Sequence, residues 1–517
     1  KDNLLDDTYW HRSPYKLREL QDAVTCNKEI YTLQHDTVYR LTSGGWQLAV
    51  SHPVKWLHSS DNKLLVYIDG LGVFQLEEND QLKGLTANYT ANDGLYTRGE
   101  YWLAVVDKGV VRLQTSGDAM FVPKGPNTNI GYFLHAAHGR IYSAIGGRWW
   151  EQYMRKPRVN IYSNSSWEKL GDEALTVYEP EWVAAYDPVS ITVDPNDPEH
   201  FYIATYCAGV FEYNHRALTR YGHGTNGSTL KAANSEVTEK HPDWIKFYTR
   251  TDGAMLDEQG NLWVLNATSL GQPVHVMTPE KKWYGLPLRV NGSLLELATP
   301  AALRMDNRDT KRKWFLDQRE SQGVILMDDG GTPTRSSDDR CVKRSEFVDQ
   351  NGNYVRPQQI YSIEQDRNDR IWIGTESGLF IIDESTDFFT SNACHRIIIP
   401  RNDGTGLGDY LLGNEQINCM ACDGGNRMWI GTAGSGLYLI EDDTITVAHF
   451  TENNSLLPSN SILSIAIIPE TGEVFVGTNN GIASYLSDAS EPHEDMSNAY
   501  AFPNPVRPEY GGSVSIT

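Results

Sequence analysis

One short stretch combines aromatic and basic residues in an otherwise acidic chain. GGRWWEQYMRKPR, at residues 146–158, holds two adjacent tryptophans and four basic side chains. Indole rings stack on the faces of sugars, and guanidinium or ammonium groups pair with phosphate. The stretch therefore predicts a sugar-phosphate site. The ordinary alternative is one buried tryptophan beside a strand edge whose basic side chains reach solvent. The candidate ligand-binding residues are Trp149, Trp150, Arg155, Lys156 and Arg158.

The other residues able to do chemistry form no recognisable motif. His135, His138, His200 and His215 are scattered without metal-ligand spacing, and neither Gly-x-Ser-x-Gly nor Gly-Lys-Ser/Thr occurs. The acidic stretch 194–200 contains two prolines, which favours a turn between strands over a calcium loop. We therefore expect no catalytic residues, no metal site, no cofactor and no enzymatic activity.

The six cysteines include a single Cys-x-x-Cys pair, Cys419 and Cys422. No second pair and no histidine pair follows at zinc-binding spacing. The surrounding text, QINCMACD, alternates as a β-strand does, which would place the two sulfur atoms on opposite faces. We interpret both cysteines as packing residues, with a redox or zinc role as the alternative.

Charge and length exclude some classes of protein. The 517 residues include 45 Lys and Arg against 67 Asp and Glu, for a formal net charge of -22. Such a surface repels a phosphate backbone, and no extended basic stripe of Lys and Arg interrupts it, so nucleic-acid binding is not expected. No apolar stretch approaches the roughly 20 residues of a membrane-spanning helix. A chain of this length should contain two or more domains or a repeat array.

Strands must position these residues, because one strand–turn–strand pattern recurs. It is clearest in RIWIGTESGLFIID (370–383), RMWIGTAGSGLYLIE (427–441) and EVFVGTNNGIASYL (473–486). Each copy places a Gly-Thr step between two apolar strands and closes the turn with a second glycine. Such a closing glycine can adopt the positive φ that a tight hairpin requires.

We interpret the repeated residues as structural residues of the fold. Isoleucines alternate with Trp372, so both faces of that strand are apolar and both must be covered. Stacked sheets provide this cover, and we therefore expect the tryptophans to pack between sheets. The structural repeat residues are Trp263, Trp372, Gly374, Gly378, Trp429, Gly431, Gly436, Gly477 and Gly481.

Weaker copies extend towards the N-terminus and bring the number of units to ten. Repeats of about 40 residues built only of strands predict β-propeller blades of four antiparallel strands. Ten units exceed the four to eight blades of one ring, so the predicted fold is all-β with two propellers. The weaker copies lie at 29–41, 63–76, 101–113, 140–153, 200–213, 261–277 and 313–328.

SIEQDRNDRIWIGTESGLFIID resembles the two-component-regulator propeller repeat of Bacteroidetes, which the units at 358–383, 415–440 and 461–486 match best. The text FPNPVRPEYGG within residues 498–517 resembles the opening of the β-sandwich that ends PorZ-like proteins of the type IX (Por) secretion system. YWHRSPY, at residues 9–15, suits the N-terminal propeller of that group. The chain is thus similar to PorZ-like proteins in outline.

This resemblance implies a domain order and a function. We place an N-terminal propeller at 1–290, a second propeller at 291–490 and the start of a C-terminal sandwich or sorting domain at 498–517; exchange of blades between the rings stays open. The resemblance implies a protein of the periplasm or outer-membrane surface. It would bind outer-membrane or secretion-complex proteins, and lipopolysaccharide or another glycan, without catalysis. The alternatives are the periplasmic glycan-sensing ectodomain of a hybrid two-component system, and a propeller lyase, for which no acid–base cluster is found.

Overall fold

The computed structural model of the chain consists of 51% strand and 3% helix. This confirms the predicted all-β class. The structure describes residues 19–106, 109–122, 124–148, 152–170, 175, 184–233, 236–269, 271–401, 403–441, 445–491, 501–502 and 515–516.

The chain forms two compact units, Lys1–Lys124 and Gly125–Thr517. This division differs from the boundary near residue 290 that the sequence suggested. The reason is that sheets before and after residue 290 pack against each other, as β21 (Thr251–Leu256) does against β27 (Pro300–Met305). Of the predicted sandwich at 498–517, the structure describes only β45 (Ala501–Phe502) and β46 (Ser515–Ile516), so the sandwich stays a prediction.

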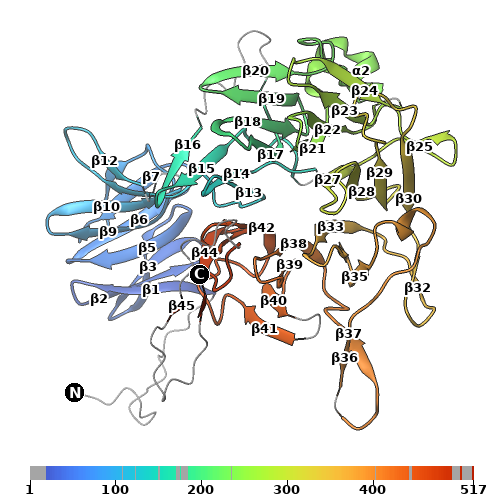
Figure 1. The fold of residues 1–517 in the computed structure, drawn as a ribbon. Coiled ribbons are helices and arrows are strands. Elements are labelled where there is room, and N and C mark those ends of the chain that lie inside the picture. Colours follow the sequence, from blue (N-terminus) through green and yellow to red (C-terminus); the bar gives the residue numbers. More distant parts are fainter. Residues whose placement is uncertain are drawn as a thin grey trace. The chain divides into compact units, whose positions relative to one another are not determined.

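The first unit contains three four-stranded antiparallel sheets in chain order (blue in Figure 1). Leu33 and Val66 meet in the apolar layer between the first two sheets. Val73 and Leu103 meet in the layer between the second and third. The strands are β1 (Leu20–Cys26), β2 (Glu29–Gln34), β3 (Thr37–Thr42), β4 (Gly45–Val50), β5 (Val54–Ser60), β6 (Lys63–Ile68), β7 (Gly72–Leu76), β8 (Leu82–Thr86), β9 (Ala91–Thr97), β10 (Glu100–Val105), β11 (Gly109–Arg112) and β12 (Ala119–Phe121).

In the part of the chain that the structure describes, the second unit contains seven larger antiparallel sheets, five of four strands and two of three, and together the ten sheets of the two units coincide with the ten predicted repeats. Their strands are β13 (Phe133–Ala137), β14 (Arg140–Ala144), β15 (Val159–Ser163), β16 (Ser166–Lys169), β17 (Pro188–Asp194), β18 (Asp197–Thr205), β19 (Gly209–Asn214), β20 (Ala217–Tyr221), β21, β22 (Leu262–Asn266), β23 (Val274–Met277), β24 (Trp283–Leu286), β27, β28 (Arg312–Asp317), β29 (Gly323–Asp328), β30 (Arg340–Arg344), β33 (Ile360–Gln365), β34 (Ile371–Thr375), β35 (Gly378–Ile382), β38 (Ile417–Cys422), β39 (Met428–Thr432), β40 (Leu437–Glu441), β41 (Ile445–Phe450), β42 (Ile462–Ile467), β43 (Glu473–Thr478) and β44 (Gly481–Leu486).

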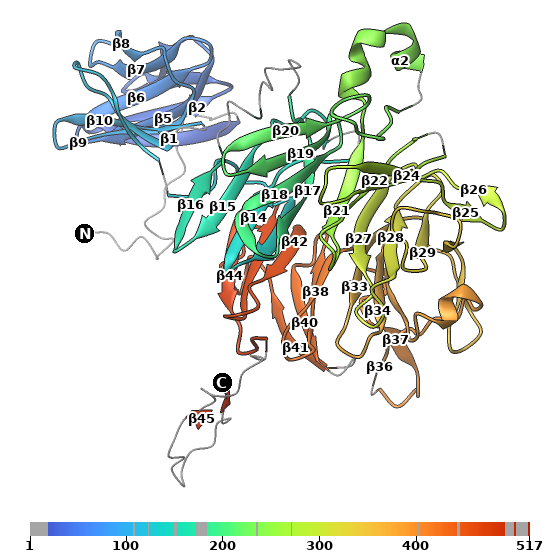
Figure 2. The same cartoon turned by 45° about the horizontal axis from the view of Figure 1, so that its top comes forward.

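The seven sheets of the second unit close into a ring, as β-propeller blades do (Figures 1 and 2). Each innermost strand lies beside the next sheet along the chain, and the first, β13, also lies against the last, β42. At this closure the Gly131 N–H donates to the Thr478 carbonyl oxygen over 2.8 Å. The chain is thereby fastened to itself across more than 300 residues.

The ring also contains short hairpins and helical segments. In the part of the chain that the structure describes, three short hairpins and three helical segments lie between the sheets. They are β25 (Arg289–Val290) with β26 (Ser293–Leu294), β31 (Phe347–Val348) with β32 (Tyr354–Val355), β36 (Ile398–Pro400) with β37 (Gly408–Tyr410), α2 (Glu236–Lys240), η3 (Pro242–Phe247) and η4 (Asp387–Phe389).

A buried aspartate organises the turn before each repeated tryptophan. The Asp366 carboxylate accepts the backbone N–H groups of Asn368 and Arg370 over 3.0 and 2.9 Å, and the Trp372 indole N–H over 2.9 Å. Asp423 binds Trp429 in the same way over 3.1 Å. Trp263, Trp372 and Trp429 are all buried, each within an apolar layer of the ring.

The Gly-Thr step brings neighbouring sheets close together. A Cβ atom on Gly374 would lie 2.8 Å from a methyl group of Ile417, on the next innermost strand, and one on Gly431 would lie 2.6 Å from Ile462. Gly477 likewise approaches the backbone of Gly131 at the ring closure. These glycines therefore allow neighbouring sheets to pack closely, because a larger residue would not fit between them. The closing glycines serve the turn, since Gly378, Gly436 and Gly481 all have positive φ, as predicted.

The hairpin at Gly378 allows a direct test. Gly378→Val should lower the free energy of unfolding by more than about 1 kcal/mol, because φ is +98° and a β-branched residue resists that region. Thermal denaturation measures the change. Gly434→Val is the matched control, because Gly434 has no positive φ and an added Cβ would meet nothing within 4 Å. Equal melting temperatures for the two variants would contradict the argument.

The buried turn allows a second test. Asp423→Ala should lower the free energy of unfolding by about 3 kcal/mol or more, because it leaves the Trp429 indole N–H and the Arg427 charge without their buried partner. Asp488→Ala removes the other carboxylate bound to Arg427, but the Asp488 side chain is 84% exposed. It should therefore cost under about 1 kcal/mol. Similar denaturation curves for both variants would refute the role given to the buried turn.

Candidate functional site

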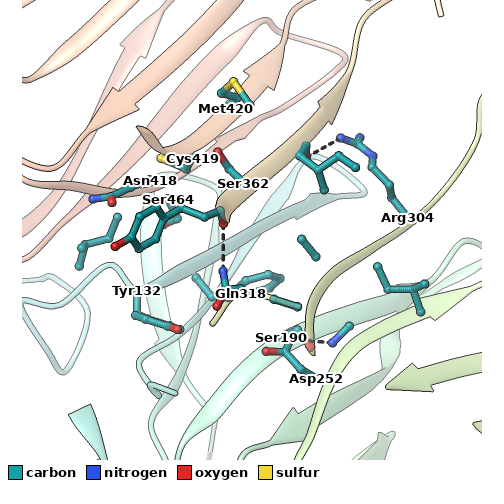
Figure 3. A pocket seen from close by; sticks show the side chains of 18 of the residues that line it. Tyr132, Ser190, Asp252, Arg304, Gln318, Ser362, Asn418, Cys419, Met420 and Ser464 are labelled. Carbon is teal, nitrogen blue, oxygen red and sulfur yellow. Dashed lines mark hydrogen bonds between the residues drawn. The ribbon is translucent and has the colours of Figure 1, made fainter. Parts of the chain in front are cut away.

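The seven innermost strands of the ring surround a cavity of about 1040 Å³. Figure 3 shows side chains from several sheets around it, among them Tyr132, Arg304, Gln318, Asn418 and Ser464. Each strand contributes alternate residues because successive side chains of a strand point to opposite faces. The lining combines small, apolar and amide-bearing side chains.

The loop from Ile145 to Arg158, between β14 and β15, reaches this cavity. Arg148 from the loop lines it, pairs with the Asp252 carboxylate on β21, and donates to the Tyr132 hydroxyl over 3.0 Å. Burial raises the pKa of Tyr132, so its hydroxyl stays neutral. Arg319, which follows β28, donates to the Tyr153 hydroxyl over 3.3 Å. The loop thus connects three sheets of the ring.

A second buried carboxylate anchors the same loop. Asp187 accepts the backbone N–H groups of Met154 and Arg155 over 3.0 and 2.8 Å, and its own carbonyl oxygen accepts the N–H of Tyr206. Burial raises the pKa of Asp187 to about 6, although both backbone donors oppose the shift. The loop is therefore held in place by a group that titrates close to neutral pH.

The predicted sugar-phosphate residues have separate surroundings. Arg155 donates to the carbonyl oxygens of Ile145 and Gly146 over 3.2 Å, and Arg158 donates to the Asn127 carbonyl oxygen. Lys156 is exposed. Trp149 and Trp150 lie outside the described residues. Two of the five predicted residues thus fasten the loop to the backbone, and the sugar-phosphate site stays a prediction.

Sequence reasoning did not identify the anchors Asp187 and Asp252. Asp187 stands just before Pro188, in a stretch without repeat character, and Asp252 opens a strand as ordinary turn residues do. Arg148 belongs to the basic stretch that the sequence singled out, but its partner is 104 positions away. Only folding brings these two together.

Arg304 and His135, two further titratable residues that line the cavity, are respectively paired and neutral. Arg304 on β27 pairs with Glu364 over 2.7 Å and donates to the Ile363 carbonyl oxygen over 3.1 Å. Burial lowers the pKa of His135 to about 4, so this imidazole is neutral at pH 7. Such ion pairs hold neighbouring strands together, and their charges offset one another within the cavity.

The acidic stretch 194–200 forms the predicted turn. Asp194 lies opposite Asp197 in the antiparallel strand ladder at the turn of the β17–β18 hairpin. His200 contacts the Asp194 carboxylate over 3.0 Å, and His215 contacts Asp197 over 2.8 Å. In the part of the chain that the structure describes, no group of three or more His, Cys, Asp or Glu side chains is placed to hold a metal ion.

Cys419 and Cys422 lie on opposite faces of β38, as predicted. Cys419 packs with the layer that contains Trp429 and Ile462, and Cys422 packs with the layer that contains Ile430. Burial raises the pKa of Cys422 to about 12 and raises that of Cys419 as well. Both thiols therefore stay protonated at neutral pH, as packing residues do.

The anchor at Asp187 should make stability depend on pH. An aspartate in an unfolded chain titrates near about 3.9, so between that pH and about 6 the folded state binds more protons and the free energy of unfolding falls as pH rises. Asp187→Asn removes this titration. We therefore expect the melting temperature of the wild type, relative to Asp187→Asn, to fall between about pH 4 and pH 7.

Thermal scans across this range measure the effect. The amide oxygen of the variant still accepts a backbone N–H, so its other costs should not vary with pH. Asp488→Asn is the control, because Arg427 lowers the pKa of Asp488 and moves its titration below this range. A difference between wild type and Asp187→Asn that stays constant from pH 4 to pH 7 would contradict the prediction.

Comparison with known proteins identifies the repeat. Residues 354–377 and 411–434 match the family model described as two component regulator propeller. No curated protein matches significantly in sequence. Among the described residues, no helix is long and apolar enough to cross a membrane.

Several solved structures are similar to this chain at low sequence identity. PorZ of Porphyromonas gingivalis, a surface component of the type IX secretion system, is 23% identical with a TM-score of 0.70, and the match covers 100% of this chain and 69% of PorZ. The extracellular domain assigned to a hybrid two-component system of B. thetaiotaomicron is 13% identical with a TM-score of 0.44, over 96% of this chain and 60% of that one. Streptogramin B lyase is 12% identical with a TM-score of 0.40, over 70% of this chain and 94% of the lyase. The chain thus carries two-component-regulator propeller repeats and shares the fold of PorZ, as its sequence predicted.

Proposed function

We propose that this chain is an exported, non-enzymatic protein that serves type IX secretion at the outer-membrane surface by binding other proteins of that system. The observation that carries this proposal is the match to PorZ over the whole chain with a TM-score of 0.70. PorZ is an essential bacterial surface component of the type IX secretion system. Shared fold supports a shared role without establishing it.

The geometry of the ring supports a binding role. Its loops are held on a rigid frame, which suits recognition of partners. Two of the arginines that line the cavity are used in ion pairs, Arg148 with Asp252 and Arg304 with Glu364. General acid–base catalysis needs titratable groups free to exchange protons with a substrate. Lipopolysaccharide binding by the Ile145–Arg158 loop is a further part of the proposal, supported by the exposed Lys156.

The alternative function is that of a periplasmic glycan-sensing ectodomain. The two matched propeller repeats favour it, because their family model is that of two-component regulators. The two functions differ in what loss of the protein changes. A secretion component changes where cargo proteins are found, whereas a sensor changes transcription in response to a glycan.

Deletion of the full-length native gene tests the proposal. We expect type IX cargo to be lost from the cell surface and to accumulate inside the cell envelope, with return to the surface on complementation by the wild-type gene. Immunoblots of surface and envelope fractions measure this. The exposed-site variant Asp488→Ala should complement as well as wild type and serves as the control. Normal cargo delivery in the deletion strain, with an altered transcriptional response to glycans, would replace the proposal by the sensing function.

A further inference from the structure

Among the described residues, one sheet of the ring has an outer edge that no other strand covers. Five of the seven sheets in the second unit have four described strands, whereas the β33–β35 and β42–β44 sheets have three. The edge of β35 is nevertheless covered, since Ile381 and His395 exchange two backbone hydrogen bonds of 2.8 Å. In the described part of the chain, β44 forms a strand ladder with β43 alone. Every second N–H and C=O of β44 therefore points away from the sheet.

The chain that follows β44 does not turn back to cover this edge. The Ser487 N–H donates to the Gly472 carbonyl oxygen over 3.2 Å, and the Glu491 N–H donates to the Pro469 carbonyl oxygen over 2.8 Å. Arg427 holds the Ser487 hydroxyl over 2.8 Å. Residues 487–491 thus run past the turn between β42 and β43. A hairpin made directly from β44 cannot supply a fourth strand.

Apolar side chains border the position of this fourth strand on both faces of the sheet. On one face lies Tyr485, which is 47% exposed. The centroid of its ring is 5.2 Å from the ring centroid of Phe450 on β41. On the other face Ile482 packs in the layer that contains Tyr162 and Trp167 of the β13–β16 sheet. Leu486, 70% exposed, lies on the same face as Ile482 by strand alternation. A strand laid along β44 would bury these groups.

The edge also lacks the features that protect exposed strands. Natural edge strands carry charged residues or proline, which prevent unwanted pairing. In this ring the outer strand β30 carries Arg340, Lys343 and Arg344. By contrast, β44 reads GIASYL and contains neither a charge nor a proline. An unprotected edge bordered by apolar groups is the kind of surface on which a peptide strand is added.

We propose that β44 binds an extended segment of a partner protein as the fourth, antiparallel strand of its sheet. The segment would supply main-chain hydrogen bonds to β44 and apolar side chains on both of its faces, as a fourth strand such as β41 does for β40. This inference rests on the proposed function, in which the chain works by binding proteins. It names the surface that binds and the chemistry of the segment that is bound.

A peptide copied from this chain tests the site. β41 holds the equivalent fourth position in its own sheet, so the labelled probe is TITVAHFT, residues 444–451. We expect saturable binding to the full chain by fluorescence anisotropy, and slower amide hydrogen exchange in β44 when the peptide is present. A peptide in which Thr446 and Val447 are both replaced by proline should not bind, because proline lacks the N–H donor.

Two protein variants localise the binding. Leu486→Asp places a charge in the proposed site and should weaken peptide binding by about tenfold or more. Leu407→Asp is the matched control, because Leu407 is 57% exposed in the loop between β36 and β37 and should leave binding unchanged. Both leucines are largely exposed, so both variants should fold. Circular dichroism and melting temperature verify this.

Each outcome decides the proposal. It is overturned by equal binding of both variants, by binding of the proline peptide, or by absence of binding to the wild type. Strong protection of the β44 amides in the free protein would also overturn it, because another part of the chain would then cover the edge. Loss of peptide binding by Leu486→Asp together with normal cargo delivery in cells would leave this binding site in place and count against the secretion role alone.

Discussion

Four of the seven sheets of the ring depend on an aspartate carboxylate in the turn between their first two strands, which accepts the indole N–H of a tryptophan on the second strand. In Asp366 and Asp423 one oxygen accepts two backbone N–H groups of the turn, and the other accepts the indole N–H of the tryptophan six residues on. A buried ionised group is tolerated only when it is fully hydrogen-bonded. The aspartate therefore fixes the turn, the register of the two strands and the position of the indole with one set of bonds.

From this constraint the packing of neighbouring sheets follows. The oriented tryptophan fills the layer between sheets, and the glycine two residues later leaves room for a branched residue of the next innermost strand, as Gly374 does for Ile417. Repetition of this contact curves the sheets into a ring that closes where Gly131 meets Thr478. Because the sheets of the ring are closely packed, their residues can be changed little without a cost in stability. The loops and the outer edge of β44 are less constrained by this packing.

In such a ring, the residues that stabilise the fold differ from the residues that are available to bind a partner. The loop that crosses to the cavity is held by the carboxylates of Asp187 and Asp252. The outer edge of β44, by contrast, is covered by no described strand, and its main-chain groups and apolar side chains form the surface that we propose for a partner. A protein that shares the fold of PorZ can thus carry its specificity on surfaces that the frame does not need.

The sequence by itself determined the features that arise from local periodicity. The ten strand units, the positive φ at Gly378 and the opposite faces of Cys419 and Cys422 were all predicted from spacing alone, because alternation and turn chemistry act within a few residues. Only the tertiary structure decided where the units divide, which sheets close the ring, and that Arg148 meets Asp252. These depend on contacts between different sheets, far apart in the sequence, and no local pattern specifies which of many equivalent sheets will be neighbours. The open edge of β44 belongs to the same class, because a strand is seen to lack a partner only when the positions of all the others are known.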